Sequence, residues 1–531
     1  MTILNRPGLA SERSRTLLLF AAFIALHLAS WPVEFSFSYW VSGDRGLFLN
    51  LSYLLDRGHR LGVDTYYLYG LLPVLVQDLL FDVFGRSHWP IIGCQIVYLA
   101  LMAHGFAKIL GHTPDPLRWT IGAVCLAPII IWVNQNFQYL FVHVSMTYAL
   151  ALVLERRLPR ALAVTMIGCW SVPSLPLVLA VGLGGLLLLD WWKSDDRRLS
   201  ALFQRFLPAL LTYVAIGLLL AAYFGWASVL ATALPFQGVK FYSEAKLGAF
   251  TSLKVFLYPG RNEARPEWSA LRYYLLDRAT WWMLSSALLA WFGARSVREL
   301  IGKREIDPRA AFIALCALIH LMFVAIAYGI PKQHVFYDFV LVAGVVAGLS
   351  AWTTAPLRKP LIGVFFVVAI ASHGHQFANT RWLWKQTQPS PQSHGFWAFP
   401  AIADDFAKLV ELSKAHHVFM LSYSTGLHHY FPTLHSADSW IINIGQLLPP
   451  DKQRLLASMD AAEYVVEDLT RFTTLFEIDA DIKGRLKALC LVSKGPNFII
   501  WRRTPDVPGG ECTSFARDLP ADYHLRGEYS L

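Results

Sequence analysis

Long apolar runs recur along this chain, and they constrain its fold more than any other feature. The segment TLLLFAAFIALHLASWPV, residues 16–33, carries no Asp, Glu, Lys or Arg. Its length is close to the roughly 20 residues with which a helix crosses a bilayer. Similar runs lie at 66–84, 90–110, 119–133, 137–154, 161–189, 207–234, 279–294, 310–330, 335–352 and 360–373. We therefore predict an α-helical polytopic membrane protein with about 10–11 transmembrane helices.

The overall composition agrees with this prediction. Hydrophobic residues make up 55% of the 531 positions, and charged residues only 16%. A soluble domain carries about 25% charged residues, so this chain has too few to cover a surface that faces only water. The first apolar run lacks a cleavage site of small residues after it, and we expect it to be retained as a signal anchor.

Basic residues account for the formal net charge of +9, and they concentrate in short loops between the apolar runs. The loops hold Arg6, Arg13 and Arg15; Arg156, Arg157 and Arg160; Lys193, Arg197, Arg198 and Arg205; Arg295, Arg298, Lys303, Arg304 and Arg309; and Arg358 and Lys359. Such loops are typical of the cytoplasmic side of a membrane protein. We expect an integral protein of a bacterial inner (plasma) membrane with a cytoplasmic N-terminus, and no nucleic-acid partner.

This orientation places a first outer loop at 34–65 and a second at 235–278. Everything after about residue 374 is then also outside. To keep the count of crossings consistent, one segment between 66 and 134 must enter the membrane without crossing it. The motif SVPSLP, residues 171–176, divides the run 161–189 into two pieces that we expect to be too short to span. Broken helices at membrane depth are tolerated where they line a cavity.

The pattern changes in the last third of the chain. Residues 402–416 have the spacing of an amphipathic helix, 417–423 and 461–468 read as strands, and two apolar stretches around Gly495 and Pro496 read as a hairpin. We predict two domains, a transmembrane module at 1–385 and a soluble extracytoplasmic α/β domain at 386–531. On that side of the membrane Cys490 and Cys512 are candidates for a disulfide, although the sequence alone does not pair them.

The first outer loop opens with VSGDRGLFLNLSYLLDRG, residues 41–58. Apolar residues of 47–58 fall on one face of a helix, with Asn50, Ser52, Asp56 and Arg57 opposite, so we expect a helix lying in the membrane interface. Asp44 precedes its first turn and suits an N-cap, with Arg45 reaching toward lipid headgroups. This structural interpretation and a catalytic role for Asp44 are both compatible with the spacing.

The residues after this helix favour the catalytic role. A second acid, Asp64, leads into the aromatic residues of TYYLYGLLP at 65–73. The order of acid, helix, Gly, Asp and Tyr-Gly-x-x-Pro resembles the first extracytoplasmic loop of the GT-C superfamily. These are polyprenyl-phosphate-sugar-dependent glycosyltransferases, and they include the protein O-mannosyltransferases and aminoarabinose transferases. The resemblance covers 40–76. Arg45 stands where relatives often have a second acid, and Leu71-Leu72-Pro73 replaces the usual Gly-Pro.

A second patch, YGIPKQHVFYDFVLVAGVVAGL at 328–349, looks like the Arg-x-x-x-His-Tyr segment that many GT-C enzymes carry near the carrier phosphates. Lys332 would replace the arginine. The alternative is a cluster satisfied by lipid headgroups, although an acid four residues into a span is less common.

The resemblance implies roles for individual residues. Asp44 would be the general base, and Asp64 a supporting acid or the ligand of a divalent metal cation. The donor phosphate would be bound by Lys332, His334 and Arg45. Candidates for the substrate pocket are Tyr66, Tyr69, Asn134, Asn136, Tyr337 and Asp338.

The function that we expect is transfer of a sugar from a polyprenyl-phosphate donor to a glycan, lipid or protein acceptor of the cell envelope. A single base and an acceptor arriving from outside predict inversion at the anomeric carbon. Two other classes stay open: a transporter or flippase of lipid-linked sugars, and a non-catalytic component of an envelope polysaccharide complex. The sugar, the acceptor and the oligomeric state do not follow from the sequence.

Overall fold

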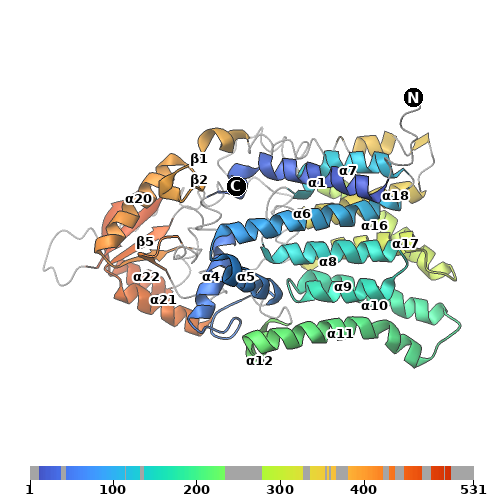
Figure 1. Cartoon of the computed structure of the whole chain (residues 1–531), viewed down its shortest axis with the longest axis horizontal. Helices are drawn as coiled ribbons and strands as arrows, with labels where there is room; N and C mark the ends of the chain where they lie inside the picture. Colours follow the sequence, from blue (N-terminus) through green and yellow to red (C-terminus); the bar gives the residue numbers. More distant parts are fainter. Residues whose placement is uncertain are drawn as a thin grey trace.

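The computed structural model describes residues 11–36, 44–67, 69–113, 115–131, 137–233, 278–326, 335–352, 356–357, 360–365, 367, 381–422, 430–436, 448–468, 480–495 and 497–503. Within this part, the chain is mostly helical and ends in a small sheet region (Figure 1). The helices before the sheet are α1 (Glu12–Ala29), α2 (Trp31–Glu34), α4 (Asp44–Asp56), α5 (Leu72–Phe84), α6 (His88–Gly111), α7 (Pro116–Ile131), α8 (Phe137–Leu154), α9 (Leu158–Cys169), α10 (Ser174–Lys193), α11 (Leu199–Phe224), α12 (Trp226–Thr232), α16 (Arg278–Gly302), α17 (Pro308–Ile326) and α18 (Val335–Trp352).

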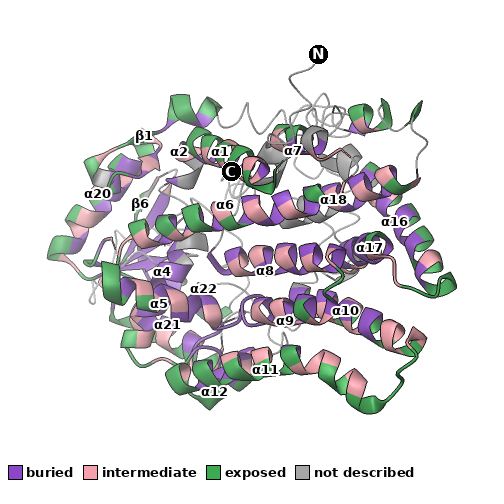
Figure 2. Cartoon of the chain, turned by 45° about the vertical axis from the view of Figure 1, so that its right-hand side comes forward, coloured by how far each residue is buried: buried purple, intermediate pink, exposed green. Residues whose placement is uncertain are grey.

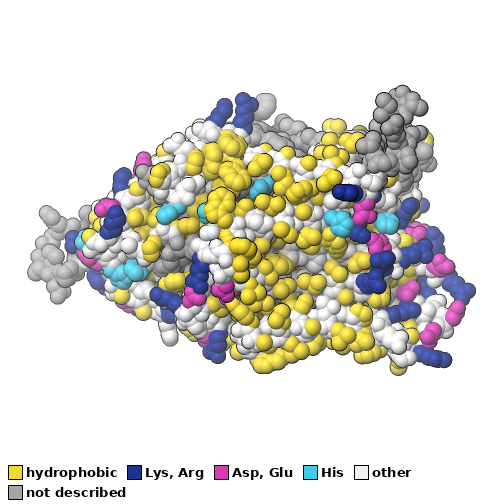
Figure 3. Space-filling view, viewed as in Figure 1, with side chains coloured by type: hydrophobic (Ala, Val, Ile, Leu, Met, Phe, Trp, Pro, Cys, Tyr) yellow, Lys and Arg dark blue, Asp and Glu magenta, His cyan; other side chains and the backbone are white. Residues whose placement is uncertain are grey.

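Among the described residues, four helical segments are long and apolar enough to cross a membrane. They are His88–Gly111, Phe137–Leu154, Pro176–Lys193 and Leu199–Phe224. These helices run side by side along the length of the molecule, and hydrophobic side chains cover much of the face over them (Figures 1 and 3). α11, the outermost of the four, is mostly exposed or partly exposed, and its buried residues are Ala209, Gly217, Leu220 and Ala221 (Figure 2). An apolar exposed surface of this kind suits contact with lipid.

The observed lengths of α5, α9 and α10 agree only in part with the lengths that the sequence predicts. α5 has 13 residues, which at 1.5 Å per residue is about 20 Å, short of the roughly 30 Å of a bilayer core. It therefore has the length expected of the segment that enters without crossing. The expectation that both halves of 161–189 are too short was wrong, because α10 has 20 residues and continues to Lys193. Only α9, with 12 residues, is short.

The basic loops gather at one end of the bundle. Arg304 pairs with Asp195 at 3.0 Å, and the Lys193 ammonium donates to backbone carbonyls at the end of α16. Near the start of α1, Glu12 lies 3.1 Å from His104, while Lys108 pairs with Glu155 at 3.0 Å. Loops that are distant in sequence thus share one charged end, and this end is at the right in Figure 3.

The C-terminal part folds as three layers at the other end. Its helices are α20 (Pro400–Ala415), α21 (Pro449–Ala461) and α22 (Ala480–Lys487), and its five-stranded sheet has the order β4 (Leu434–His435), β3 (Val418–Leu421), β5 (Tyr464–Asp468), β7 (Phe498–Arg502), β6 (Cys490–Lys494). A separate two-stranded sheet pairs β1 (Gln388–Pro389) with β2 (Trp397–Ala398), and the 3-10 turn η2 (Pro391–Ser393) lies between them. β3 is parallel to β4 and β5, whereas β7 is antiparallel to β5 and β6. The sequence predictions of a helix at 402–416, of the two strands and of the hairpin are confirmed.

Alternation along the strands explains the layers. Phe419 and Val465 face the helices α21 and α22, while their neighbours Val418 and Val466 join the core that contains Phe406 of α20. Successive residues of a strand point to opposite faces, so one sheet buries both sets. Cys490 is disulfide-bonded, whereas Cys94, Cys125, Cys169 and Cys316 are free; Cys512 lies outside the described residues.

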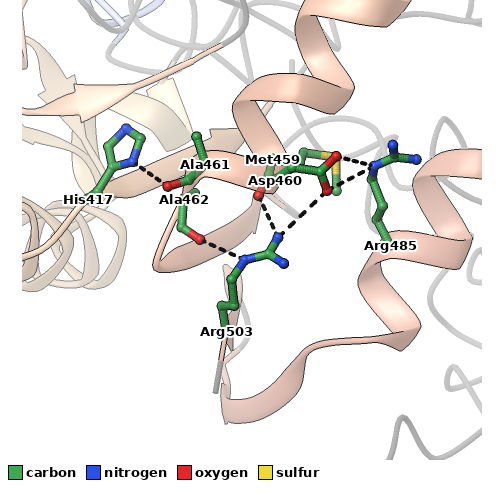
Figure 4. A network of polar contacts seen from close by, with 7 residues as sticks. All are labelled: His417, Met459, Asp460, Ala461, Ala462, Arg485 and Arg503. Carbon is green, nitrogen blue, oxygen red and sulfur yellow. Dashed lines mark hydrogen bonds and ion pairs between the residues drawn. The ribbon is translucent and has the colours of Figure 1, made fainter. Parts of the chain in front are cut away.

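The end of α21 is closed by a polar network (Figure 4). Arg503 donates to the carbonyls of Met459 and Ala462 at 3.0 and 3.3 Å, and His417 contacts the carbonyl of Ala461 at 3.0 Å. Arg485 reaches both oxygens of Asp460 at 3.0 Å. The last carbonyls of a helix lack partners within it, so cationic side chains here satisfy them and complement the helix dipole.

Candidate functional site

Helix α4 begins at Asp44 and lies between the helical bundle and the C-terminal layers (Figure 1). The sequence predicts a helix in the membrane interface with a polar face in water, and the structure differs. Phe48, Leu51 and Leu54 are buried, but so are Asn50 and Ser52, which are only 2% and 1% exposed. A helix with buried residues on both faces is packed within protein. Among the residues of α4 whose burial is described, Asp56 in the last turn is the exposed one.

A buried amide of α5 holds α4 in place. The Gln77 side-chain nitrogen donates to the carbonyl of Phe48 at 2.5 Å and to the Ser52 hydroxyl at 3.4 Å. Gln77 is fully buried. Its nitrogen is paired, whereas its buried oxygen has no hydrogen-bond partner among the described residues. The pairing of the nitrogen links α4 to α5 and fixes their relative position. Sequence reasoning missed Gln77, because one polar residue in an apolar run has many possible partners.

The loop after α4 turns at Gly58 and Gly62, whose φ values of 77° and 78° suit glycine. Asp64 closes this turn: its carboxylate accepts bonds from the Arg60 guanidinium at 2.9 Å on each oxygen, and from the Arg60 backbone N–H at 3.0 Å. The Arg60 side chain lowers the pKa of Asp64 to about 2. Asp64 was predicted to support the base or bind a metal. The structure shows it ion-paired within its own loop.

The other side of this loop faces helix α21. The Asp451 carboxylate accepts the backbone N–H of Tyr66 at 2.8 Å, and the Arg454 guanidinium donates to the carbonyl of Asp64 at 2.8 Å. Arg454 also pairs with Asp451 at 2.7 Å. Burial raises the pKa of Asp451, and these donors oppose that shift. The C-terminal layers therefore bind the segment after α4 directly.

The segment after the loop meets the break between α9 and α10. The Gly70 N–H donates to the carbonyl of Ser171 at 2.6 Å, and the Leu72 N–H donates to that of Trp170 at 3.0 Å. The Ser171 hydroxyl bonds the carbonyl of Gln138, at the start of α8. The SVPSLP motif, which signalled a break, thus brings three segments together.

Two predicted pocket tyrosines have different surroundings. Tyr66 is buried beside Asp451. Tyr69 is half-buried, and its ring lies 6.0 Å from that of Tyr139. From Tyr139 a string of polar rings continues to His143, whose Nδ1 lies 2.9 Å from the Tyr98 hydroxyl. Tyr98 lines an apolar groove.

That groove, with a volume of about 440 Å³, runs between α5, α6, α8 and α9. Val76 and Phe137 line it near the C-terminal layers, and Lys108 and Glu155 line it at the basic end. Apolar side chains supply most of the rest. A lining of this kind suits a hydrocarbon chain.

The remaining predicted residues are only partly described. α4 starts at Asp44 and includes Arg45, and α18 includes Tyr337 and Asp338, but only the backbone of these four is described. Residues Lys332, His334, Asn134 and Asn136 lie outside the described residues. Their roles stay predictions.

No group of three or more His, Cys, Asp or Glu side chains that could hold a metal occurs among the residues that the structure describes. The metal predicted at Asp64 stays a prediction.

In the C-terminal layers, His435 is exposed with its ring 4.5 Å from that of His417. The part of the His435 ring that neighbouring atoms shield from water is the main cause that lowers its pKa, and the nearby His417 lowers it further.

Comparison of the chain with family models, with curated proteins and with solved structures found no match.

Proposed function

We propose that this chain is a polytopic membrane glycosyltransferase of GT-C type. It transfers a sugar from a polyprenyl-phosphate donor to an acceptor at the outer face of the membrane, with inversion and with Asp44 as general base. The four long apolar helices, together with the shorter ones that pack against them, would form the membrane module. The basic loops at one end would face the cytoplasm.

The observation that carries the proposal is the packing of α4, which begins at Asp44. This helix is buried where the bundle meets the C-terminal layers, and Gln77 ties it to α5 one residue from Val76 of the apolar groove. The backbone of Asp44 therefore belongs to a helix that is fixed against α5. The helix dipole also favours negative charge there. The groove lined by Val76 on the neighbouring helix α5 suits a donor that is held by its lipid.

The reaction needs two kinds of group. The acceptor oxygen attacks the anomeric carbon, its proton passes to the Asp44 carboxylate, and the bond from that carbon to the phosphate oxygen breaks. The electron pair leaves with polyprenyl phosphate. Cations stabilise the departing phosphate, a role for Lys332, His334 and Arg45. Such a transition state resembles an oxocarbenium ion.

The disulfide at Cys490 supports an extracytoplasmic location of the C-terminal layers, because disulfides persist in oxidising compartments. The acceptor would then approach from the same side as these layers. The location of the protein in a bacterial inner membrane is part of the proposal.

One observation favours a flippase of lipid-linked sugars as the second candidate. The apolar groove extends to Lys108 and Glu155 at the basic end, so it is lined along most of the bundle. A carrier that moves lipid between leaflets would use such a path. It would not need a base at Asp44.

The test is to delete the gene in the source organism and compare envelope glycans and glycolipids by mass spectrometry. Complementation then uses wild type, Asp44→Asn and the matched control Asp56→Asn, which changes an exposed acid at the other end of α4. We expect Asp44→Asn to lack the glycan and to accumulate donor lipid, and Asp56→Asn to restore it.

Three results would contradict parts of this proposal. Full restoration by Asp44→Asn would exclude Asp44 as the base and favour the flippase. Identical glycans with and without the gene would refute sugar transfer. A product that retains the anomeric configuration of the donor would refute the single displacement.

A further inference from the structure

We infer that Asp451 and Arg454 of α21 clamp the first outer loop, and that the C-terminal layers thereby position the proposed site. Asp451 and Arg454 are named here the α21 clamp. The inference rests on the proposed function and adds positioning residues that lie far from Asp44 in the sequence. Their contacts to the loop cross 385 and 390 positions.

The Asp451 carboxylate is buried, and both of its oxygens accept hydrogen bonds. It is 0% exposed. One carboxylate oxygen, Oδ2, accepts the N–H groups of Tyr66 and Leu448 at 2.8 and 3.1 Å, and the other, Oδ1, accepts Arg454 at 2.7 Å. The Thr65 hydroxyl adds a further hydrogen bond. Several charge-assisted bonds are needed to offset the cost of burying a carboxylate.

This arrangement requires two acceptor oxygens. An asparagine in the same place would turn its NH₂ group either toward Arg454 or toward the N–H groups of Tyr66 and Leu448. In either orientation a donor meets a donor. The buried N–H group of Tyr66 or the guanidinium would then lose its partner, which costs more than the bond itself contributes.

The clamp acts on a loop that is already held from its other side. The N–H groups of Gly70 and Leu72 donate hydrogen bonds to carbonyls at the break between α9 and α10. Asp64 closes the turn by pairing with Arg60. On the N-terminal side, the loop continues directly from α4: the His59 N–H bonds the carbonyl of Leu54 at 3.0 Å. Movement of the loop would therefore displace the C-terminal end of α4, the helix whose first residue is Asp44.

The experiment uses the full chain in detergent or lipid nanodiscs. The main variant is Asp451→Asn. The matched control is Asp460→Asn, an acid on the same helix whose carboxylate binds Arg485 within the C-terminal layers (Figure 4). Asp451→Glu, which keeps two acceptor oxygens, serves as the conservative rescue. Amide hydrogen exchange is measured on peptides from 60–67 and from the sheet, and glycans are measured after complementation of the deletion strain.

We expect exchange of the 60–67 peptide to rise at least about tenfold in Asp451→Asn, which corresponds to about 1.4 kcal/mol for the lost bond. Exchange in the sheet should stay at the wild-type level. Glycan product should fall at least about tenfold, and Asp451→Glu should recover part of it. Asp460→Asn should leave both the loop and the product unchanged.

Unchanged exchange of 60–67 in Asp451→Asn would overturn the clamp. Faster loop exchange with undiminished product, in a strain where Asp44→Asn abolishes product, would overturn its positioning role. Loss of product with accelerated exchange throughout the sheet would show general unfolding, and would also contradict the inference. Failure of the proposed function looks different: the deletion strain and wild type would then have the same glycans, whatever the exchange of the loop.

Discussion

Replacing Gly70 by alanine should destabilise the junction between the segment that leads into α5 and the break after α9. An alanine Cβ at this position would lie 2.2 Å from the Trp170 carbonyl oxygen, 2.3 Å from its carbon and 2.8 Å from the Ser171 nitrogen. All three are backbone atoms, so no side chain can rotate away. Relief requires the two segments to separate by about 1.2 Å, the difference between 2.2 Å and the 3.4 Å of ordinary contact.

Such a separation breaks the bonds from Gly70 to Ser171 and from Leu72 to Trp170, at 2.6 and 3.0 Å. Ser171 and Trp170 are buried, so water does not replace these bonds. A buried group left without its partner costs about 1–3 kcal/mol. For two bonds, the expected loss is about 2–6 kcal/mol of unfolding free energy.

The assay follows thermal unfolding of the purified chain with a thiol-reactive fluorescent dye. Cys169, in the last turn of α9 next to the altered junction, and Cys316 are buried, so their reaction with the dye reports unfolding above the constant signal of the exposed Cys125. Gly93→Ala is the matched control, because a Cβ there meets nothing within 4 Å. We expect Gly70→Ala to unfold several degrees below wild type, and Gly93→Ala to equal or exceed it. Equal midpoints for the two variants would refute the reasoning.

Three further predictions concern contacts around the same end of the molecule. Gln77→Leu should cost about 1–3 kcal/mol in the same thermal assay, since the Phe48 carbonyl loses its buried donor; an unchanged midpoint would contradict the tie between α4 and α5. For Asp64, the folded-state pKa of about 2 lies below the ordinary 3.8, so its ion pair stabilises the protein above pH 4 and this contribution is lost as the pH falls toward 2. Asp64→Asn should remove that pH dependence and lower the unfolding free energy at pH 7 by at most about 1 kcal/mol, because the ion pair is partly exposed. Unfolding midpoints measured over a pH series test this, and a decrease equivalent to several kcal/mol at pH 7 would argue for another role of Asp64. Arg503→Ala should cost about 1–2 kcal/mol of unfolding free energy, because the carbonyls at the end of α21 lose their donor (Figure 4). The control is Arg502→Ala, because the Arg502 side chain pairs with Glu463 at 3.6 Å and stacks on Tyr464. Equal effects of the two variants would contradict the capping role of Arg503.

Local patterns explain which parts of the fold were predictable. Apolar runs, strand alternation and the SVPSLP break each involve residues that are close in the sequence. They predict the helices, the hairpin and the interruption after α9. The Arg60–Asp64 pair is also local, at a spacing of four residues. That spacing is a signal for an ion pair, but the resemblance to a catalytic loop pointed to a different role for Asp64.

The errors have a different origin. Asn50 and Ser52 have the pattern of a water-facing side of α4, because a single helix does not show what covers it. The partner of Ser52, Gln77, comes from another helix. Asp451 had no signal at all, since it stands on a mostly polar helix and its loop contact is 385 positions away. Contacts between residues so far apart in the sequence depend on the whole fold, so the sequence of one segment does not predict them.

The separation between Tyr66 and Asp451 also orders events during biosynthesis. A ribosome adding about 5–20 residues per second needs about 20–80 s between these two positions. In the proposed topology, α4 and its loop would be on the outer side of the membrane during that time, without the helix α21 that later binds the loop. The proposed enzyme is therefore incomplete until nearly the whole chain has been made and its last segment exported, and a nascent or truncated chain would occupy the membrane without acting on the donor lipid.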